Sequence, residues 1–134
     1  MTEDALLALL RALRDRVVGV TDTALASRDG LIITSDTADI DPDNLAALAA
    51  ASLGLAQRIC AEAGKGTLRE ATTRGSGGIV AVYAVGTSAL LVVVGDEGLD
   101  ATRLHRESRP TVEAIEALLR RGQSGFGGAG MAAS

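Results

Sequence analysis

The stretch that decides the fold is DPDNLAALAAASLGLAQRICAEA, residues 41–63. Asp41 is placed to cap a helix, because its side-chain oxygen can accept a hydrogen bond from a backbone N–H that has no partner in the first turn. Pro42 suits the first helical position, where no backbone donor is needed. Gly64 and Gly66 follow the stretch and supply a stop signal. The sequence therefore predicts one long helix here.

This predicted helix carries apolar residues on two faces. Residues at steps of three and four form one face, which we expect to pack on a sheet: Leu45, Leu48, Ser52, Leu55 and Ile59. A second face is small or apolar, with almost no charge before Arg58: Ala46, Ala50, Leu53, Gly54 and Gln57. Because a solvated face normally carries charges, we expect the helix to have a second partner besides its own core. The alternative is an Ala-rich surface helix kept for its helix propensity.

The composition fits one globular domain and excludes several classes of function. The chain has 134 residues, and 47% of them are hydrophobic, which is enough for a core. Its net charge of −4 and near absence of aromatic residues argue against nucleic-acid binding, which needs basic patches and stacking surfaces. The single cysteine, Cys60, fits a reducing cytoplasm. We see neither a signal peptide nor a membrane span of roughly 20 apolar residues, so we expect a cytoplasmic protein without membrane insertion.

Seven further elements are expected around the long helix. They are a helix at 2–17, strands at 20–27 and 31–35 joined by a tight turn, a weak edge strand from 65 or 66 to 74, two buried strands at 79–85 and 89–94, and a last helix at 101–121. Pro110 predicts a kink or break of the last helix near Arg109. Residues 122–134 are rich in Gly and Ala and are expected to form a disordered tail beyond a domain of residues 1–121.

This order predicts an α/β (α+β) fold built as a three-layer α-β-α sandwich. The order is helix, two strands, helix, three strands, helix. The five strands are expected to form a mostly antiparallel sheet. The long helix at 41–63 would cover one face of this sheet, and the two terminal helices would cover the other.

No catalytic, metal-binding or cofactor-binding constellation emerges from the sequence. The segment Gly64-Lys65-Gly66-Thr67 lacks the spacing of a phosphate loop, and the only histidine, His105, is expected to be an exposed surface residue. Arg28, at the tip of the predicted hairpin, is the one residue placed like a trans-acting arginine finger, although arginines at hairpin tips are usually plain turn residues. We therefore expect a protein that is not an enzyme and that binds other proteins.

The whole arrangement resembles the Roadblock / dynein light chain family over about residues 3–121. The resemblance is carried by the first helix, the hairpin 20–35 with its turn Ser27-Arg28-Asp29-Gly30-Leu31, the Ala/Leu-rich helix, and the run GIVAVYAVGTSALLVVV at 78–94. The chain looks most similar to the short, stand-alone bacterial members common in high-GC actinobacteria.

The resemblance implies a homodimer in which the third strands pair across a two-fold axis and the two long helices lie side by side. On this basis the dimer interface is assigned to Ala46, Ala50, Leu53, Gln57, Leu68, Glu70 and Thr72. It also implies that a small Ras-like GTPase binds on the paired helices, assigned to Ala47, Gly54 and Arg58, and that a sensor-kinase-like protein belongs to the same system. The family has no catalytic residue to transfer, and any activation would act by ordering the GTPase's own residues.

A second hypothesis is a small-ligand sensor domain of similar three-layer shape. Such a domain needs a cavity with a few convergent polar groups. The sequence offers little polarity in its core strands beyond Tyr83.

Overall fold

The computed structural model describes the backbone of residues 2–133 and the side chains of residues 2–122. The elements in chain order are α1 (Thr2–Arg16), β1 (Val20–Ser27), β2 (Ile32–Asp36), α2 (Pro42–Glu62), β3 (Glu70–Gly75), β4 (Gly78–Val85), β5 (Ala89–Asp96) and α3 (Ala101–Ala133). The strands form one sheet in the order β2-β1-β5-β4-β3, and every neighbouring pair is antiparallel. The predicted element order and antiparallel sheet are confirmed.

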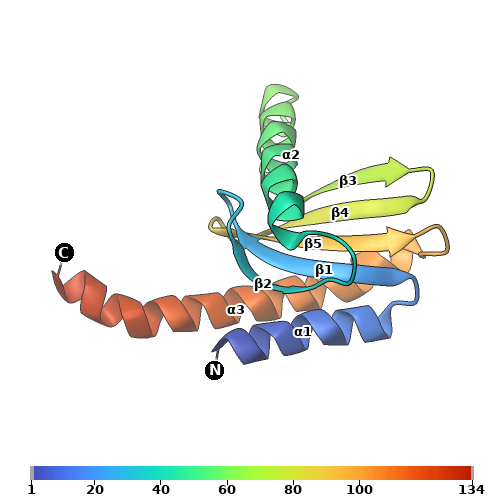
Figure 1. The fold of residues 1–134 in the computed structure, drawn as a ribbon. Coiled ribbons are helices and arrows are strands. Elements are labelled where there is room, and N and C mark those ends of the chain that lie inside the picture. Colours follow the sequence, from blue (N-terminus) through green and yellow to red (C-terminus); the bar gives the residue numbers. More distant parts are fainter. Residues whose placement is uncertain (1, 134) are drawn as a thin grey trace.

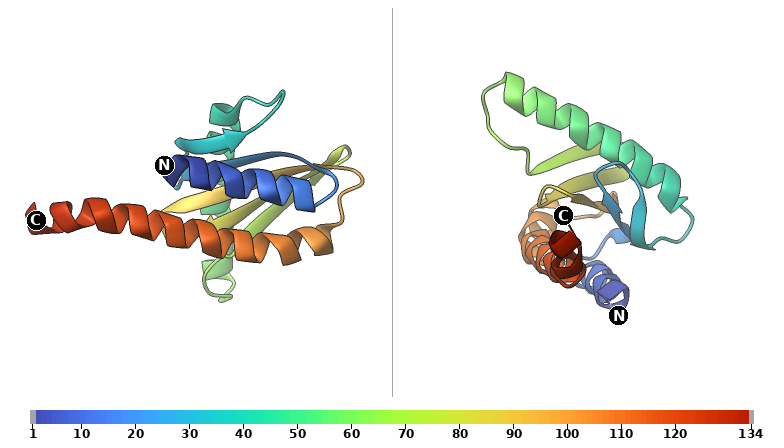
Figure 2. Two further views of the ribbon diagram at one scale, coloured as in Figure 1. Left: turned by 90° about the horizontal axis from the view of Figure 1, so that it is seen from below. Right: turned by 90° about the vertical axis from the view of Figure 1, so that its left-hand side faces the viewer.

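The sheet lies between two helical layers, as Figure 1 shows. α2 crosses one face, while α1 and α3 run side by side along the other (Figure 2). The middle strands are buried from both sides: Val82, Leu90 and Val92 contribute to the core under α2, and Tyr83 and Leu91 to the core under α1 and α3. The predicted three-layer sandwich is confirmed.

The α1/α3 layer is held by large aliphatic side chains and by ion pairs. The predicted stripe of α1 is buried, since Leu10 and Leu13 are fully covered. On α3, Leu104 and Ile115 are also fully covered. The guanidinium Nε of Arg16 lies 3.5 Å from Oε1 of Glu107, which ties the two helices together.

α2 begins as its sequence dictates. The Oδ1 atom of Asp41 accepts a hydrogen bond of 3.0 Å from the backbone N–H of Asp43, and Pro42 stands at the start of the helix. The helix ends at Glu62 with Ala63 as its C-cap, and Gly64 follows with φ +68°, a conformation that glycine adopts without steric cost.

Two predictions about the elements need correction, besides several ends that differ by one or two residues. β3 begins at Glu70 rather than at residue 65 or 66, because the backbone N–H of Leu68 donates to Oε1 of Gln57 at 2.9 Å and not to a strand. Of the predicted kink or break near Arg109, the break is wrong, because α3 continues through Pro110. Pro110 removes the donor for the carbonyl of Arg106, and both residues are exposed, so water can satisfy that carbonyl.

The prediction of a tail after Arg121 falls on residues 122–134. The backbone of α3 is assigned as helix to Ala133, whereas the side chains from residue 123 onwards lie outside the described part of the chain. The disordered tail therefore stays a prediction.

Candidate functional site

The two faces of α2 differ sharply in exposure. Its inner face packs on the sheet through Ala46, Ala49 and Leu53, of which Ala46 is 0% and Leu53 1% exposed. Its outer face presents Leu48, Leu55 and Ile59, which are 71%, 61% and 61% exposed. These three residues are spaced by seven and four, so they form one stripe along the helix. We call them the outer α2 stripe.

The predicted assignment of the two faces is therefore wrong. Leu48, Leu55 and Ile59 were expected in the core, and the sheet is instead covered by the face with smaller side chains. The reason is close approach: a Cβ atom placed on Gly30, at the β1–β2 turn, would lie only 3.1 Å from the Cα atom of Ala47. A helix this close to a hairpin leaves room beneath it for alanine rather than for a row of leucines.

The correction extends to two of the residues assigned to the dimer interface, and three more make contacts within their own protomer. Ala46 and Leu53 are covered by their own protomer, and Leu68 is only 9% exposed in the same core. Ala50 packs partly against that core, and Gln57 holds the backbone of Leu68. Ala46 and Leu53 therefore offer no surface to a second copy, whereas the assignment of Ala50, Gln57 and Leu68 to the interface stays a prediction.

The remaining assigned residues are accessible. Glu70 is half-buried and Thr72 is exposed on β3, while Ala47, Gly54 and Arg58 are exposed on α2. A Cβ atom added at Gly54 would have no neighbouring atom within 4 Å. Their predicted roles in dimerisation and partner binding stay predictions.

Sequence reasoning missed the outer α2 stripe as a surface. The sequence does contain the inner face as a pattern, because Ala46, Ala49 and Leu53 also follow helical spacing. Periodicity finds both stripes but does not say which one faces the sheet. The volume available beneath the helix decides between them, and this volume depends on the hairpin turn at Gly30.

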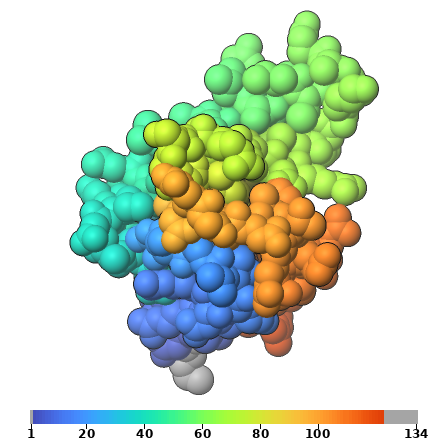
Figure 3. All heavy atoms as spheres, turned by 90° about the vertical axis from the view of Figure 1, so that its right-hand side faces the viewer, coloured from blue at the N-terminus to red at the C-terminus, as the bar shows by residue number. Residues whose placement is uncertain are grey.

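β3 is an open edge of the sheet in the described part of the chain. It pairs with β4 from Glu70 opposite Tyr83 to Gly75 opposite Gly78 and has no strand on its other side. Thr72, Thr73 and Arg74 are exposed there. Open edges present unpaired backbone groups to which another strand can bind. The C-terminal half of α2 projects beyond the body of the molecule (Figure 3).

By length and composition alone, α2 is also the one helix of the described residues that could cross a membrane. In the folded domain the inner face of α2 packs on the sheet, and Asp41, Asp43 and Glu62 lie at its two ends. A helix with apolar residues on both faces in such a setting indicates a second packing partner.

Arg28 is tied into the structure. Its Nε atom donates to the carbonyl oxygen of Ala89 at 2.9 Å, and a terminal nitrogen donates to that of Gly86 at 2.8 Å. The guanidinium thereby joins the β1–β2 turn to the β4–β5 turn. This geometry favours the interpretation of Arg28 as a turn residue over the arginine finger.

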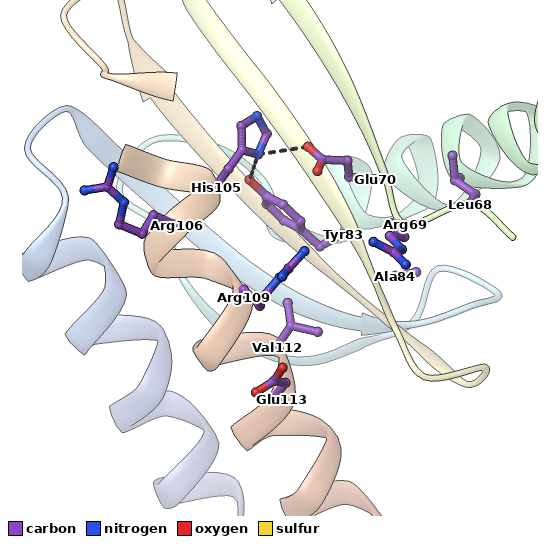
Figure 4. A pocket seen from close by; sticks show the side chains of 10 residues that line it. All are labelled: Leu68, Arg69, Glu70, Tyr83, Ala84, His105, Arg106, Arg109, Val112 and Glu113. Atoms are coloured by element: carbon purple, nitrogen blue, oxygen red, sulfur yellow. Dashed lines mark hydrogen bonds and ion pairs between the residues drawn. The ribbon is translucent and has the colours of Figure 1, made fainter. Parts of the chain in front are cut away.

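On the opposite face of the sheet, three polar side chains from distant segments meet. His105 Nδ1 lies 2.9 Å from Oε2 of Glu70 and 3.1 Å from the hydroxyl oxygen of Tyr83. Burial raises the pKa of Tyr83 from 10.0 to about 12; the charge of Glu70 adds to this rise, and Ser108 opposes it. His105 is exposed, as predicted, but its ring is anchored rather than free. Figure 4 shows this cluster at the rim of a cavity beside α3.

Comparison with known proteins gives one consistent result. The family model of the Roadblock/LC7 domain matches residues 6–95. The Roadblock/LC7 domain from Streptomyces avermitilis is 26% identical with a TM-score of 0.80, over 84% of this chain and 96% of that one. A structure of MglB with a tetrameric arrangement is 20% identical with a TM-score of 0.83, over 90% and 92% of the two chains. An uncharacterized protein from Methanocaldococcus jannaschii is 28% identical over 105 residues, 78% of this chain and 91% of the relative.

Proposed function

The chain belongs to the Roadblock/LC7 family, and on this premise we propose that it is a non-enzymatic, homodimeric regulator or scaffold that binds a small Ras-like GTPase. The outer α2 stripe is the surface through which it binds its partners. The regulator acts in the cytoplasm, within a bacterial signalling system that includes a sensor-kinase-like protein.

The observation that carries this proposal is the exposure of Leu48, Leu55 and Ile59. Covering one large aliphatic side chain contributes roughly 2 kcal/mol, so the stripe offers about 6 kcal/mol before the cost of association. This amount is substantial for a surface formed by a single helix. Without a partner the stripe would stay in water, and the domain would not gain this free energy. A stripe with so few charges is typical of a binding surface.

Self-association is supported by two features that adjoin each other. The open edge of β3 can pair with the same edge of a second copy, and the projecting half of α2 would then meet its equivalent across the two-fold axis. Glu70 and Thr72 would lie at this strand junction. The MglB structure with a tetrameric arrangement supports self-association on the same fold.

GTPase binding is supported by the family resemblance and by the chemistry of α2. Ala47 and Gly54 flank the outer α2 stripe and leave room for a partner backbone, while Arg58 adds a single cation next to Ile59. A paired-helix platform of this kind positions a partner without supplying a catalytic group. Regulation would then consist of ordering residues that belong to the GTPase.

A pull-down from the native cell lysate with either a GTP analogue or GDP tests the proposal. We expect mass spectrometry to identify a small GTPase captured in one nucleotide state. The variant Leu48→Asp should lose it, and Val18→Asp is the matched control, because Val18 is an 83% exposed aliphatic residue far from α2 in sequence. Capture that is absent in both nucleotide states, or that is equally strong with Leu48→Asp, would contradict the proposal.

A further inference from the structure

A cavity of about 620 Å³ opens between α3 and the β3–β4 edge of the sheet. α1 packs against α3, β1 and β2, so α3 alone covers this end of the sheet. The cavity walls combine apolar and charged side chains: Leu68, Arg69, Glu70, Tyr83, Ala84, His105, Arg106, Arg109, Val112 and Glu113. Cavities of this size and mixed lining are typical of small-molecule sites.

The hydroxyl of Tyr83 does not use its proton on His105, and Ser108 is its other polar neighbour within the protein. A carboxylate only accepts hydrogen bonds, so the 2.9 Å contact between Glu70 Oε2 and His105 Nδ1 places a proton on that nitrogen. The same N–H then faces the Tyr83 oxygen at 3.1 Å, which acts as an acceptor. The phenol proton is thus not used on His105. Because its pKa is raised to about 12, Tyr83 stays protonated in neutral solution.

The cations that line the cavity are not neutralised by the protein. Within the described residues, no carboxylate lies within 4 Å of a nitrogen of Arg69, Arg106 or Arg109, since the ion pairs there involve other side chains. Of the two glutamates in the lining, Glu70 is engaged by His105. The lining holds three arginines and two glutamates, so its formal charge is +1 in a chain whose net charge is −4.

The three arginine side chains point in different directions. Figure 4 shows Arg109 extending from α3 toward Tyr83 and the middle of the group, whereas Arg106 points away from it. Arg69 precedes β3 and approaches from the sheet side. Guanidinium groups bind carboxylate and phosphate oxygens in pairs of parallel hydrogen bonds, which an ammonium cannot do.

We propose that this cavity binds a small organic anion, with its carboxylate or phosphate group held by Arg69 and Arg109. The hydroxyl of Tyr83 donates to an oxygen of the ligand, and Val112 covers its apolar part. The Glu70–His105 pair fixes the orientation of the phenol. The site lies on the α3 face of the sheet, opposite α2. The site is therefore separate from the outer α2 stripe, it shares Glu70 with the proposed β3 junction, and its ligand binding goes beyond the proposed function.

The test is an NMR titration of the ¹⁵N-labelled full chain with citrate and with inorganic phosphate, two probes that carry the two candidate groups. Glycerol is the uncharged control. We expect saturable shifts of the backbone signals of Arg69, Tyr83 and Arg109 with at least one anion and none with glycerol. Loss of one charge-assisted hydrogen-bonding partner should weaken binding by about tenfold or more in Arg109→Gln.

Arg103→Gln is the matched control, because it removes the same charge from the same helix outside the cavity lining. Its affinity should stay within about twofold of the parent chain. Tyr83→Phe should weaken binding while leaving the spectrum folded. The proposal is overturned if neither anion gives saturable shifts, or if Arg103→Gln and Arg109→Gln lose affinity equally. Because the readout involves no GTPase, its result is independent of the pull-down.

Discussion

The two helical layers of this domain differ in how completely their apolar side chains are covered. The α1/α3 layer has two helices that pack on each other, cover their large aliphatic residues and expose charged ones, with Arg16 and Glu107 joining them. The α2 layer is a single helix whose inner face seals the sheet while its outer face leaves Leu48, Leu55 and Ile59 in solvent. Within residues 2–122, the two helices of the α1/α3 layer leave no large aliphatic side chain exposed, which suits a layer that stabilises the fold. A layer that keeps an apolar stripe uncovered is available to another chain.

The most direct test of this difference places the same charge on either face of α2. Leu53→Asp buries a carboxylate under the helix, and we expect it to cost roughly 4 kcal/mol or more, a large share of the stability of a small domain. Leu55→Asp, two residues later, should cost much less, because it removes only the contribution of dimerisation and leaves the core of the protomer intact. Urea unfolding followed by circular dichroism measures both. Equal losses for the two variants would contradict the assignment of the faces.

Substitutions of two glycines test the same difference between the faces, with smaller expected changes in stability. Gly30→Ala places a Cβ atom 3.1 Å from the Cα atom of Ala47 at φ +89°, and should destabilise the domain by about 1–3 kcal/mol. Gly54→Ala, on the open side of α2, meets nothing within 4 Å and should add up to about 1 kcal/mol through helix propensity. Thermal unfolding of both variants checks the signs. A stabilising Gly30→Ala would show that the hairpin does not limit the approach of α2.

The smallest effect concerns the other layer and depends on pH. Burial raises the pKa of Tyr83 from 10.0 to about 12, so the unfolded chain loses this proton first. The contribution of Tyr83 to stability is thus complete below pH 10 and is lost as the pH rises toward 12. Because Tyr83 is the only tyrosine, phenolate absorbance follows it alone. A native midpoint at the ordinary value of 10.0 would contradict its burial, and Tyr83→Phe should remove this part of the alkaline loss.

Local chemistry made most of the fold predictable. The cap at Asp41, the turn glycines and the apolar runs at 79–85 and 89–94 each act within a few residues, and the bounds of β1 and the start of α2 were found from them. Pro110 does not end α3, and the freed carbonyl of Arg106 lies at the exposed side of the helix, where water can satisfy it. In these cases the sequence signal and its physical cause lie in the same segment.

The surfaces were less predictable because their causes are not local. Which stripe of α2 faces the sheet depends on how closely Gly30 lets the helix approach, and that distance belongs to the assembled fold. The cluster of Glu70, Tyr83 and His105 spans 35 positions and is assembled by the β3–β4 register together with α3. In the sequence, Tyr83 is a single polar residue in an apolar strand, and this pattern does not indicate Glu70 or His105 as its partners.

Sedimentation equilibrium of the purified chain tests the central claim most directly, namely that the outer α2 stripe is a binding surface. We expect a dimer for the parent chain and for Val18→Asp, and a folded monomer for Leu55→Asp. A parent chain that stays monomeric at high concentration, or a Leu55→Asp variant that dimerises as strongly as the parent, would contradict the claim.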